Sequence, residues 1–231
     1  MKAAAIQMDV RIHAKEHNLS QILRRLEEAA AQFQQVLRSR PGDPDARFGL
    51  ANVLYKQGRT QEAIANLRLT ISAKPDYPEA LNNLGRALFK AGRADEAIDA
   101  CQKATSLMPA YALAHYNLGC ALGAKGRFDE AILELREAAR LKPELAAAHN
   151  DLGAALLSKG LLPQAIAAFE RAAAADPADP DYHTHLGVAR ASSGQIGRAM
   201  AQYEEALRLK PGDPTATKLL GEARANGPSS R

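Results

Sequence analysis

The chain has 231 residues, of which 46% are hydrophobic, 24% charged and 5% aromatic, with no tryptophan. A hydrophobic content this high excludes general disorder. Abundant alanine and leucine with few aromatic residues favour close-packed helices over a sheet core. The formal net charge of +4 at pH 7 is only mildly basic and falls short of a nucleic-acid-binding surface, so we expect no nucleic-acid partner.

Cysteine content and hydropathy indicate where the protein resides. Cys101 and Cys120 are the only cysteines, and two are too few for a disulfide framework in a chain of this length, which favours a reducing compartment. Asp9 and Arg11 interrupt the N-terminus before a signal peptide could form. No run of 18 apolar residues is present, so no membrane insertion is expected. We predict a soluble cytoplasmic protein.

Residues 1–43 form an N-terminal segment that ends in a degenerate copy of a repeat found further along the chain. Ala29 and Phe33 keep the phase of that repeat, so residues 24–41 are predicted to form its second helix. Ser20 is placed to cap a longer helix, because its hydroxyl can accept a hydrogen bond from a backbone N–H group.

The beginning of this segment leaves two interpretations open. Residues 6–14, IQMDVRIHA, alternate apolar and polar side chains with a period of two. That alternation indicates either a strand or a helix without a clear apolar face, frayed or poorly matched to the repeats. An exposed strand would offer an edge to a partner or to another copy of the chain.

Between residues 44 and 213 the sequence repeats with a period of 34 residues and without insertions. The segments LNNLGRALFKAGRADEAI, HYNLGCALGAKGRFDEAI and HNDLGAALLSKGLLPQAI begin at Leu81, His115 and His149. This phase divides the chain into five repeats, which cover residues 44–77, 78–111, 112–145, 146–179 and 180–213.

Each repeat is predicted to form two helices. A glycine ends the first helix, because glycine takes a left-handed conformation cheaply at a helix C-terminus. A proline ends the second, because proline cannot continue a helix. The glycines are Gly58, Gly92, Gly126, Gly160 and Gly194, and the prolines are Pro75, Pro109, Pro143, Pro177 and Pro211. One pair is too small to bury its own apolar face, so neighbouring pairs are expected to stack.

The C-terminal end carries half a repeat. Residues 214–227 repeat the first-helix pattern, with Leu220 and Gly221 in register, and then reach Pro228. We expect a capping helix over residues 214–227, with a polar side turned to solvent, followed by a short tail at residues 228–231.

A 34-residue period with these landmarks resembles the tetratricopeptide repeat family. The Leu-Gly pair of that family falls on Leu84-Gly85, Leu118-Gly119, Leu152-Gly153 and Leu186-Gly187, and its small alanine on Ala63, Ala97, Ala131, Ala165 and Ala199. The resemblance implies an all-α fold, a right-handed α-solenoid of stacked antiparallel helix pairs with a concave and a convex face.

In this family a stripe of first-helix residues lines the concave groove. The stripe recurs at spacings of three and four, which puts its members on one helix face. The peptide-binding groove is therefore expected to be lined by Phe48, Asn52, Tyr55, Lys56, Asn82, Asn83, Arg86, Phe89, Lys90, Tyr116, Asn117, Asn150, Asp151 and His185. The same stripe also carries Cys120, Ala154, Ser158 and Val188.

Asparagines on this stripe suit the binding of a peptide main chain, because an amide both donates and accepts hydrogen bonds. Asn83 and Asn117 are similar to an asparagine ladder in the repeat domain of O-GlcNAc transferases. That resemblance implies peptide binding tolerant of sequence. Asp151 and His185 occupy the same position in the next repeats, so the ladder is partial. The asparagines are expected to be exposed.

No constellation in the sequence predicts catalysis, a metal or a cofactor. His115, His149 and His183 occupy equivalent positions in successive repeats, which should lie roughly 8–10 Å apart. Zinc holds each nitrogen at about 2.0–2.1 Å, so packing is the expected role of these histidines. Neither cysteine has a spacing typical of redox or nucleophilic chemistry, and no phosphate-binding glycine motif is present.

Three functions are therefore considered. The leading prediction is a non-enzymatic adaptor whose groove binds an extended or helical segment of another protein. The first alternative is a self-assembling homo-oligomeric scaffold that docks through residues 1–20 or the terminal repeats. The second is a targeting domain of a larger enzyme such as a glycosyltransferase.

Overall fold

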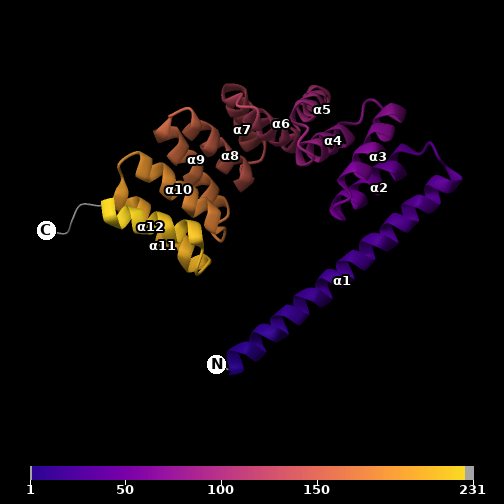
Figure 1. Cartoon of the computed structure of the whole chain (residues 1–231). Coiled ribbons are helices and arrows are strands. Elements are labelled where there is room, and N and C mark those ends of the chain that lie inside the picture. The colour runs from indigo at the N-terminus through magenta and orange to yellow at the C-terminus, as the bar shows by residue number, and fades with distance from the viewer. Residues whose placement is uncertain (1, 227–231) are drawn as a thin grey trace. The chain divides into compact units, whose positions relative to one another are not determined.

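A computed structural model of the protein describes the backbone of residues 2–226 and the side chains of residues 18–225 (Figure 1). Over the described backbone the chain forms twelve α-helices and no strand. The prediction of an all-α fold built from packed helix pairs is confirmed. Among the described residues, no helix combines the length and the hydropathy that crossing a membrane requires.

The helices divide into two compact units, the first ending at Leu107 and the second beginning at Met108, here called unit 1 and unit 2. In each unit the two helices of a pair pack together and each pair packs on the next. Unit 1 contains α1 (Lys2–Ser39), α2 (Pro44–Lys56), α3 (Thr60–Ala73), α4 (Pro78–Lys90) and α5 (Ala94–Leu107). Unit 2 contains α6 (Ala112–Ala124), α7 (Phe128–Leu141), α8 (Ala146–Ser158), α9 (Leu162–Ala175), α10 (Pro180–Ser192), α11 (Ile196–Leu209) and α12 (Pro214–Asn226).

Local chemistry sets where these helices begin and end. At α2 the side chain of Asp43 accepts hydrogen bonds from the N–H groups of Asp45 and Ala46, which have no partner within the helix. Gly58 follows α2 with a φ of 78°, a conformation that favours glycine. Its N–H group donates to the carbonyl of Tyr55. The same glycine turn follows α4, α6, α8 and α10.

Four glycines let the helices of a pair approach each other closely. A Cβ atom on Gly153 of α8 would lie 2.7 Å from ring atoms of Phe169 on α9, closer than carbon atoms pack in proteins. Gly85, Gly119 and Gly187 meet the side chains of Cys101, Leu135 and Tyr203 in the same way. Each of these glycines is half of a Leu-Gly pair, so the motif marks the contact between the two helices of a repeat.

In the N-terminal segment the structure decides between the two interpretations of residues 6–14 in favour of a helix. α1 is one continuous helix from Lys2 to Ser39, so the strand considered for residues 6–14 is wrong. Ser20 lies inside this helix and does not cap its start. Residues 1–40 contain no glycine or proline and many good helix formers, so nothing in the local sequence ends the helix earlier.

Two expectations fall partly or wholly outside the described residues. The side chains of residues 1–17, on which an N-terminal contact with another copy would depend, lie outside them, and so does the tail at residues 228–231. The last described helix, α12, buries Leu220 and Ala223 in a cluster with Tyr203 of α11. Its Lys218 and Glu222 side chains are exposed.

We predict that the Gly153→Ala variant is less stable than the wild-type protein by about 1–3 kcal/mol, because the added methyl group overpacks the contact with Phe169. Gly221→Ala is the matched control. Gly221 holds the same repeat position in α12, but an added Cβ there would meet no atom within 4 Å. That control should gain up to about 1 kcal/mol from helix propensity. Urea unfolding of both variants measures the difference, and equal stabilities would contradict the prediction.

Candidate functional site

In unit 1 the stripe brings three amide side chains together. Asn83 of α4 donates a hydrogen bond to the Oδ1 atom of Asn52 on α2, with 2.7 Å between the two atoms. The Nδ2 atom of Asn82 lies 3.3 Å from the Oδ1 atom of Asn83. An amide offers two N–H groups and two lone pairs, so Asn52 and Asn83 retain hydrogen-bonding capacity beyond these contacts. Both side chains are half-buried.

The same stripe is cationic toward the C-terminal ends of α2 and α4. The Arg86 guanidinium and the Lys90 ammonium lie 4.5 Å and 4.9 Å from the centre of the Tyr55 ring, within cation–π distance. Lys56 and Phe89 are exposed on the same two helices. This part of unit 1 therefore combines positive charge with aromatic surface.

Two of the predicted site residues in unit 1 are placed differently from expectation. Asn82 is only 2% exposed, so the expectation that it is exposed is wrong. Phe48 packs its ring against Tyr77 at 4.9 Å between centroids, which directs it to the start of α4. Burial, together with a hydrogen bond to Asp45, raises the pKa of Tyr77 to about 12. Its hydroxyl therefore stays protonated.

In unit 2 the stripe forms a longer polar chain. Cys120 of α6 lies 3.3 Å from one carboxylate oxygen of Asp151 on α8, and the Asn150 amide donates to the other oxygen at 3.0 Å. His185 of α10 completes the chain, with 2.8 Å between its Nδ1 atom and the Oδ1 atom of Asn150. Side chains from three successive first helices thus join in one network.

Tyr116 lies at the α6 end of this network. Burial is the main cause that raises the pKa of its hydroxyl well above the ordinary range, and the neighbouring Cys120 and Asp151 raise it further. The hydroxyl therefore remains a hydrogen-bond donor at neutral pH. Asn117, one residue further along α6, is half-buried. This end of the unit 2 stripe presents both a phenol and an amide.

An apolar pocket of about 200 Å³ adjoins the unit 2 stripe. Ala154, Ser158, His185 and Val188 were predicted on the stripe and line it, together with Leu157 and Phe169. Sequence reasoning missed Phe169, because this residue lies on the second helix, which is not expected to reach the stripe. The signal that could have found it is Gly153, since a glycine facing a large side chain lets that side chain extend further.

The three histidines that hold equivalent positions in successive repeats contact the turn that precedes their own helix. The Nε2 atom of His115 lies 2.9 Å from the carbonyl oxygen of Pro109, and Arg47 donates to the carbonyl of Pro41 in the same way. His149 and His183 make the equivalent contacts to Pro143 and Pro177. Over the described residues no group of histidine, cysteine and acidic side chains is arranged to hold a metal ion.

Cys101 occupies a position unsuited to nucleophilic chemistry. It is buried on α5 against Gly85, and burial raises the pKa of its thiol to about 12. The thiolate is the reactive form of cysteine, so at neutral pH this side chain is an inert part of the core.

Family models described as tetratricopeptide repeat match residues 23–78 and 116–180, residues 54–118 and 88–138, and residues 180–213. Among curated proteins, no sequence matches the chain significantly.

Several solved structures share the fold. MamA is 26% identical, with a TM-score of 0.65, and the match covers 70% of this chain and 94% of that one. TTC0263 of Thermus thermophilus is 25% identical, with a TM-score of 0.61 and coverage of 79% and 100%. YrrB, described as a TPR protein with an unusual peptide-binding site, is 22% identical, with a TM-score of 0.68 and coverage of 82% and 98%.

We predict that Cys101 resists alkylation in the folded protein while Cys120, which is half-buried, reacts. The cause is the burial of the Cys101 thiol and its raised pKa. Iodoacetamide labelling at pH 8, followed by peptide mass spectrometry, measures the two sites separately. Labelling in denaturant is the control and should modify both cysteines. Rapid labelling of Cys101 in the native state would contradict the prediction.

Proposed function

Because the chain belongs to the tetratricopeptide repeat family, we propose that it is a non-enzymatic adaptor that binds an extended segment of a partner protein along the first-helix stripes. The observation that carries this proposal is the series of hydrogen-bonding side chains contributed by successive first helices. Asn83 contacts Asn52 across one pair of helices, and His185 contacts Asn150 across another.

Main-chain recognition follows from the chemistry of these side chains. An extended peptide presents alternating N–H and C=O groups, and each must find a partner when it is removed from water. Amides such as Asn83 and Asn117 can serve either group. These main-chain contacts are therefore tolerant of the partner's sequence, as expected from the resemblance to the O-GlcNAc transferase repeats.

The charges and pockets on the stripes restrict the partner further. In unit 1 the cations Lys56, Arg86 and Lys90 are exposed, which favours acidic side chains on the bound segment. In unit 2 the apolar pocket beside His185 suits one small apolar side chain of the partner. We propose that a segment bound at unit 1 carries acidic residues and that a segment bound at unit 2 carries a small apolar side chain.

A second candidate function, self-association, has its own supporting observation. On α1 the side chains of Leu19, Ile22 and Leu23 are 57%, 54% and 45% exposed. Leu26 and Phe33, further along α1, pack against the core of unit 1. The three exposed side chains lie on the same apolar face of the helix, at helical spacing. An exposed apolar face of this kind favours docking of a second copy.

We predict that stripe variants weaken peptide binding without loss of fold. Peptides are first selected from a random library on the wild-type protein, and their affinities are then measured by fluorescence polarisation. Asn83→Ala in unit 1 and Asn150→Ala in unit 2 should each weaken the peptide bound at that unit about 2- to 10-fold, the loss expected for one hydrogen bond.

Two controls separate main-chain recognition from other binding. Asn66→Ala removes an amide from α3, where Asn66 donates to its own helix, and should leave affinity unchanged. N-methylation of the peptide backbone should weaken binding more than alanine substitution of the peptide side chains. The proposal fails if the stripe variants bind all selected peptides as tightly as the wild-type protein, with helicity by circular dichroism unchanged.

For self-association we predict a dimer that dissociates when the α1 face is made polar. Light scattering coupled to gel filtration measures the mass of the wild-type protein and of the Leu19→Gln/Leu23→Gln variant over a range of concentrations. Leu133→Gln is the matched control, because Leu133 is 64% exposed and belongs to α7 of unit 2, not to α1. A wild-type protein that stays monomeric, or a variant that dimerises equally well, would contradict this candidate.

A further inference from the structure

A second candidate site lies in unit 2 among α7, α8 and α9. His149 of α8 lines two adjoining pockets of about 380 Å³ and 680 Å³, and Arg171 of α9 lines both as well. None of the residues lining these pockets belongs to the predicted peptide-binding stripe. The site is therefore independent of the function proposed above.

His149 carries a buried hydrogen-bonding group without a partner. The side chain is 5% exposed, and its Nε2 atom lies 2.9 Å from the carbonyl oxygen of Pro143. Because a carbonyl oxygen only accepts hydrogen bonds, Nε2 carries the proton. The other ring nitrogen, Nδ1, is buried and has no hydrogen-bond partner, an arrangement that costs free energy.

The neighbouring repeats show what usually contacts this nitrogen. The Nδ1 atom of His115 lies 2.6 Å from a carboxylate oxygen of Glu134, a side chain of the following second helix. In the same way the Nδ1 atom of His183 lies 3.0 Å from the amide oxygen of Gln202. In both repeats the partner follows the histidine by 19 residues and reaches it through an oxygen atom.

In the repeat that contains His149 this position is Ala168. The methyl side chain of alanine has no oxygen atom, and Ala168 instead lines the pocket of about 380 Å³ beside the histidine. The space that the long side chain of Glu134 fills in the preceding repeat is therefore part of a pocket here. A ligand that enters it with an oxygen atom would restore the contact that the other repeats make internally.

The charges around the pocket favour an anionic oxygen. Arg136 of α7 and Arg171 of α9 both line it, with no acidic side chain among its lining residues. The Arg136 guanidinium donates to the neutral amide of Gln164 at 2.8 Å, so this contact leaves its positive charge without compensation.

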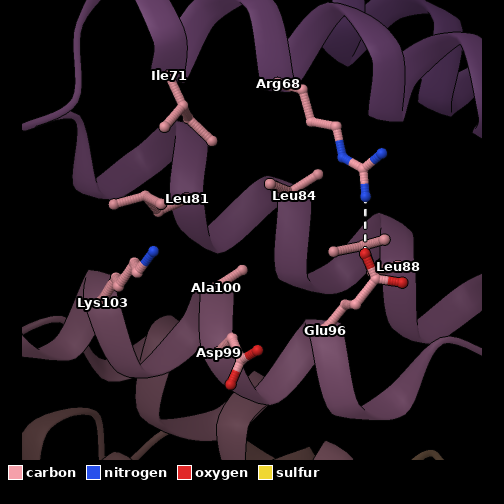
Figure 2. Close-up of a pocket in the computed structure, with 9 residues that line it drawn as sticks. All are labelled: Arg68, Ile71, Leu81, Leu84, Leu88, Glu96, Asp99, Ala100 and Lys103. Atoms are coloured by element: carbon pink, nitrogen blue, oxygen red, sulfur yellow. Dashed lines mark hydrogen bonds and ion pairs between the residues drawn. The ribbon is translucent and has the colours of Figure 1, made fainter.

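The equivalent pocket in unit 1 lacks these features (Figure 2). Leu81 replaces the histidine, and the Arg68 guanidinium is paired with the Glu96 carboxylate at 2.7 Å. Asp99 also lines this pocket, together with Lys103. Its two cations are thus matched by two carboxylates. The pocket of unit 2 keeps the two cations but has neither acid.

We propose that the His149 pocket binds a carboxylate ligand. One carboxylate oxygen accepts a hydrogen bond from the Nδ1 atom of protonated His149, as the Glu134 carboxylate is placed to do from His115. The ligand also pairs with Arg171 and Arg136. Binding takes up one proton at Nδ1, and Nε2 keeps its hydrogen bond to Pro143.

The uptake of a proton makes the proposed binding pH-dependent. The charged groups that share the two pockets with His149 are Arg136 and Arg140 from α7, Glu144 from the α7–α8 turn and Arg171 from α9. Three of these four are cations, so the surroundings of the ring carry a net positive charge until an anion enters. Affinity is therefore expected to fall by roughly tenfold per pH unit where the unliganded ring is neutral.

The test is an NMR titration of the isotope-labelled full chain with glutarate, following the ring resonances of His149 at pH 6 and pH 8. We expect saturable shifts at pH 6 that give a dissociation constant in the millimolar range or tighter. At pH 8 we expect weaker binding. A parallel titration with N-acetylglutamate amide, which carries only a side-chain carboxylate, identifies the source of the ligand. Tighter binding of this probe indicates an acidic residue of a polypeptide, and tighter binding of glutarate indicates a free dicarboxylate.

Two variants test the proposed contact, and each copies an arrangement that already exists in the chain. Ala168→Glu reproduces the His115–Glu134 pair and should block binding by filling the pocket from within. His149→Leu reproduces the combination of Leu81 and Ala100 in unit 1 and should abolish binding. Both are checked for fold by circular dichroism, and if Ala168→Glu does not fold, His149→Leu decides the outcome.

Ala201→Glu is the charge control, because it places the same added carboxylate on an exposed position of α11. It should bind glutarate as the wild-type protein does. The proposal is overturned if glutarate causes no saturable shift at pH 6 up to roughly 20 mM, well above the millimolar affinity expected. It is also overturned if affinity is the same at both pH values, or if His149→Leu binds as tightly as the wild-type protein.

Discussion

The close approach of the two helices within each pair is the constraint on which the rest of this structure depends. A backbone without a Cβ atom at Gly153 lets the Phe169 ring pack directly on α8, and the same contact recurs at Gly85, Gly119 and Gly187. Because this contact sets which face of the first helix turns inward, it also sets which face is left to carry the stripe. The polar side chains of the candidate peptide site are thus positioned by apolar packing on the other side of the same helix.

A second recurring contact joins four of the five helix pairs to the turn before them. Arg47, His115, His149 and His183 all reach the carbonyl of the preceding turn proline. In the second repeat Leu81 holds this position and fills it with apolar volume. This role accounts for histidines that recur every 34 residues without forming a metal site. The contact also leaves the other ring nitrogen, Nδ1, to find a hydrogen-bond partner on the following helix. The side chain that the following helix offers at this place differs from repeat to repeat.

Much of the fold could be predicted because its signals are local. The period, the turn glycines and the prolines mark helix ends through backbone chemistry that operates within a few residues. The same reasoning applied to residues 1–40, which contain neither glycine nor proline, would have predicted one continuous α1. The alternation over residues 6–14 leaves both a strand and a helix open when it is taken alone. A short run with a period of two does not outweigh an uninterrupted series of helix formers.

The sequence by itself therefore determined the helix pairs, their phase and the residues available on each face. Only the tertiary structure decided which of those residues meet. Asn83 bonds to Asn52, 31 residues away, and His185 to Asn150, 35 residues away, while Asn82 is buried despite its place on a polar stripe. Helix ends follow from the conformational preferences of neighbouring residues, whereas contacts between repeats depend on how whole helices pack. For the same reason, the pocket beside His149 becomes apparent only when Ala168 is compared in space with Glu134.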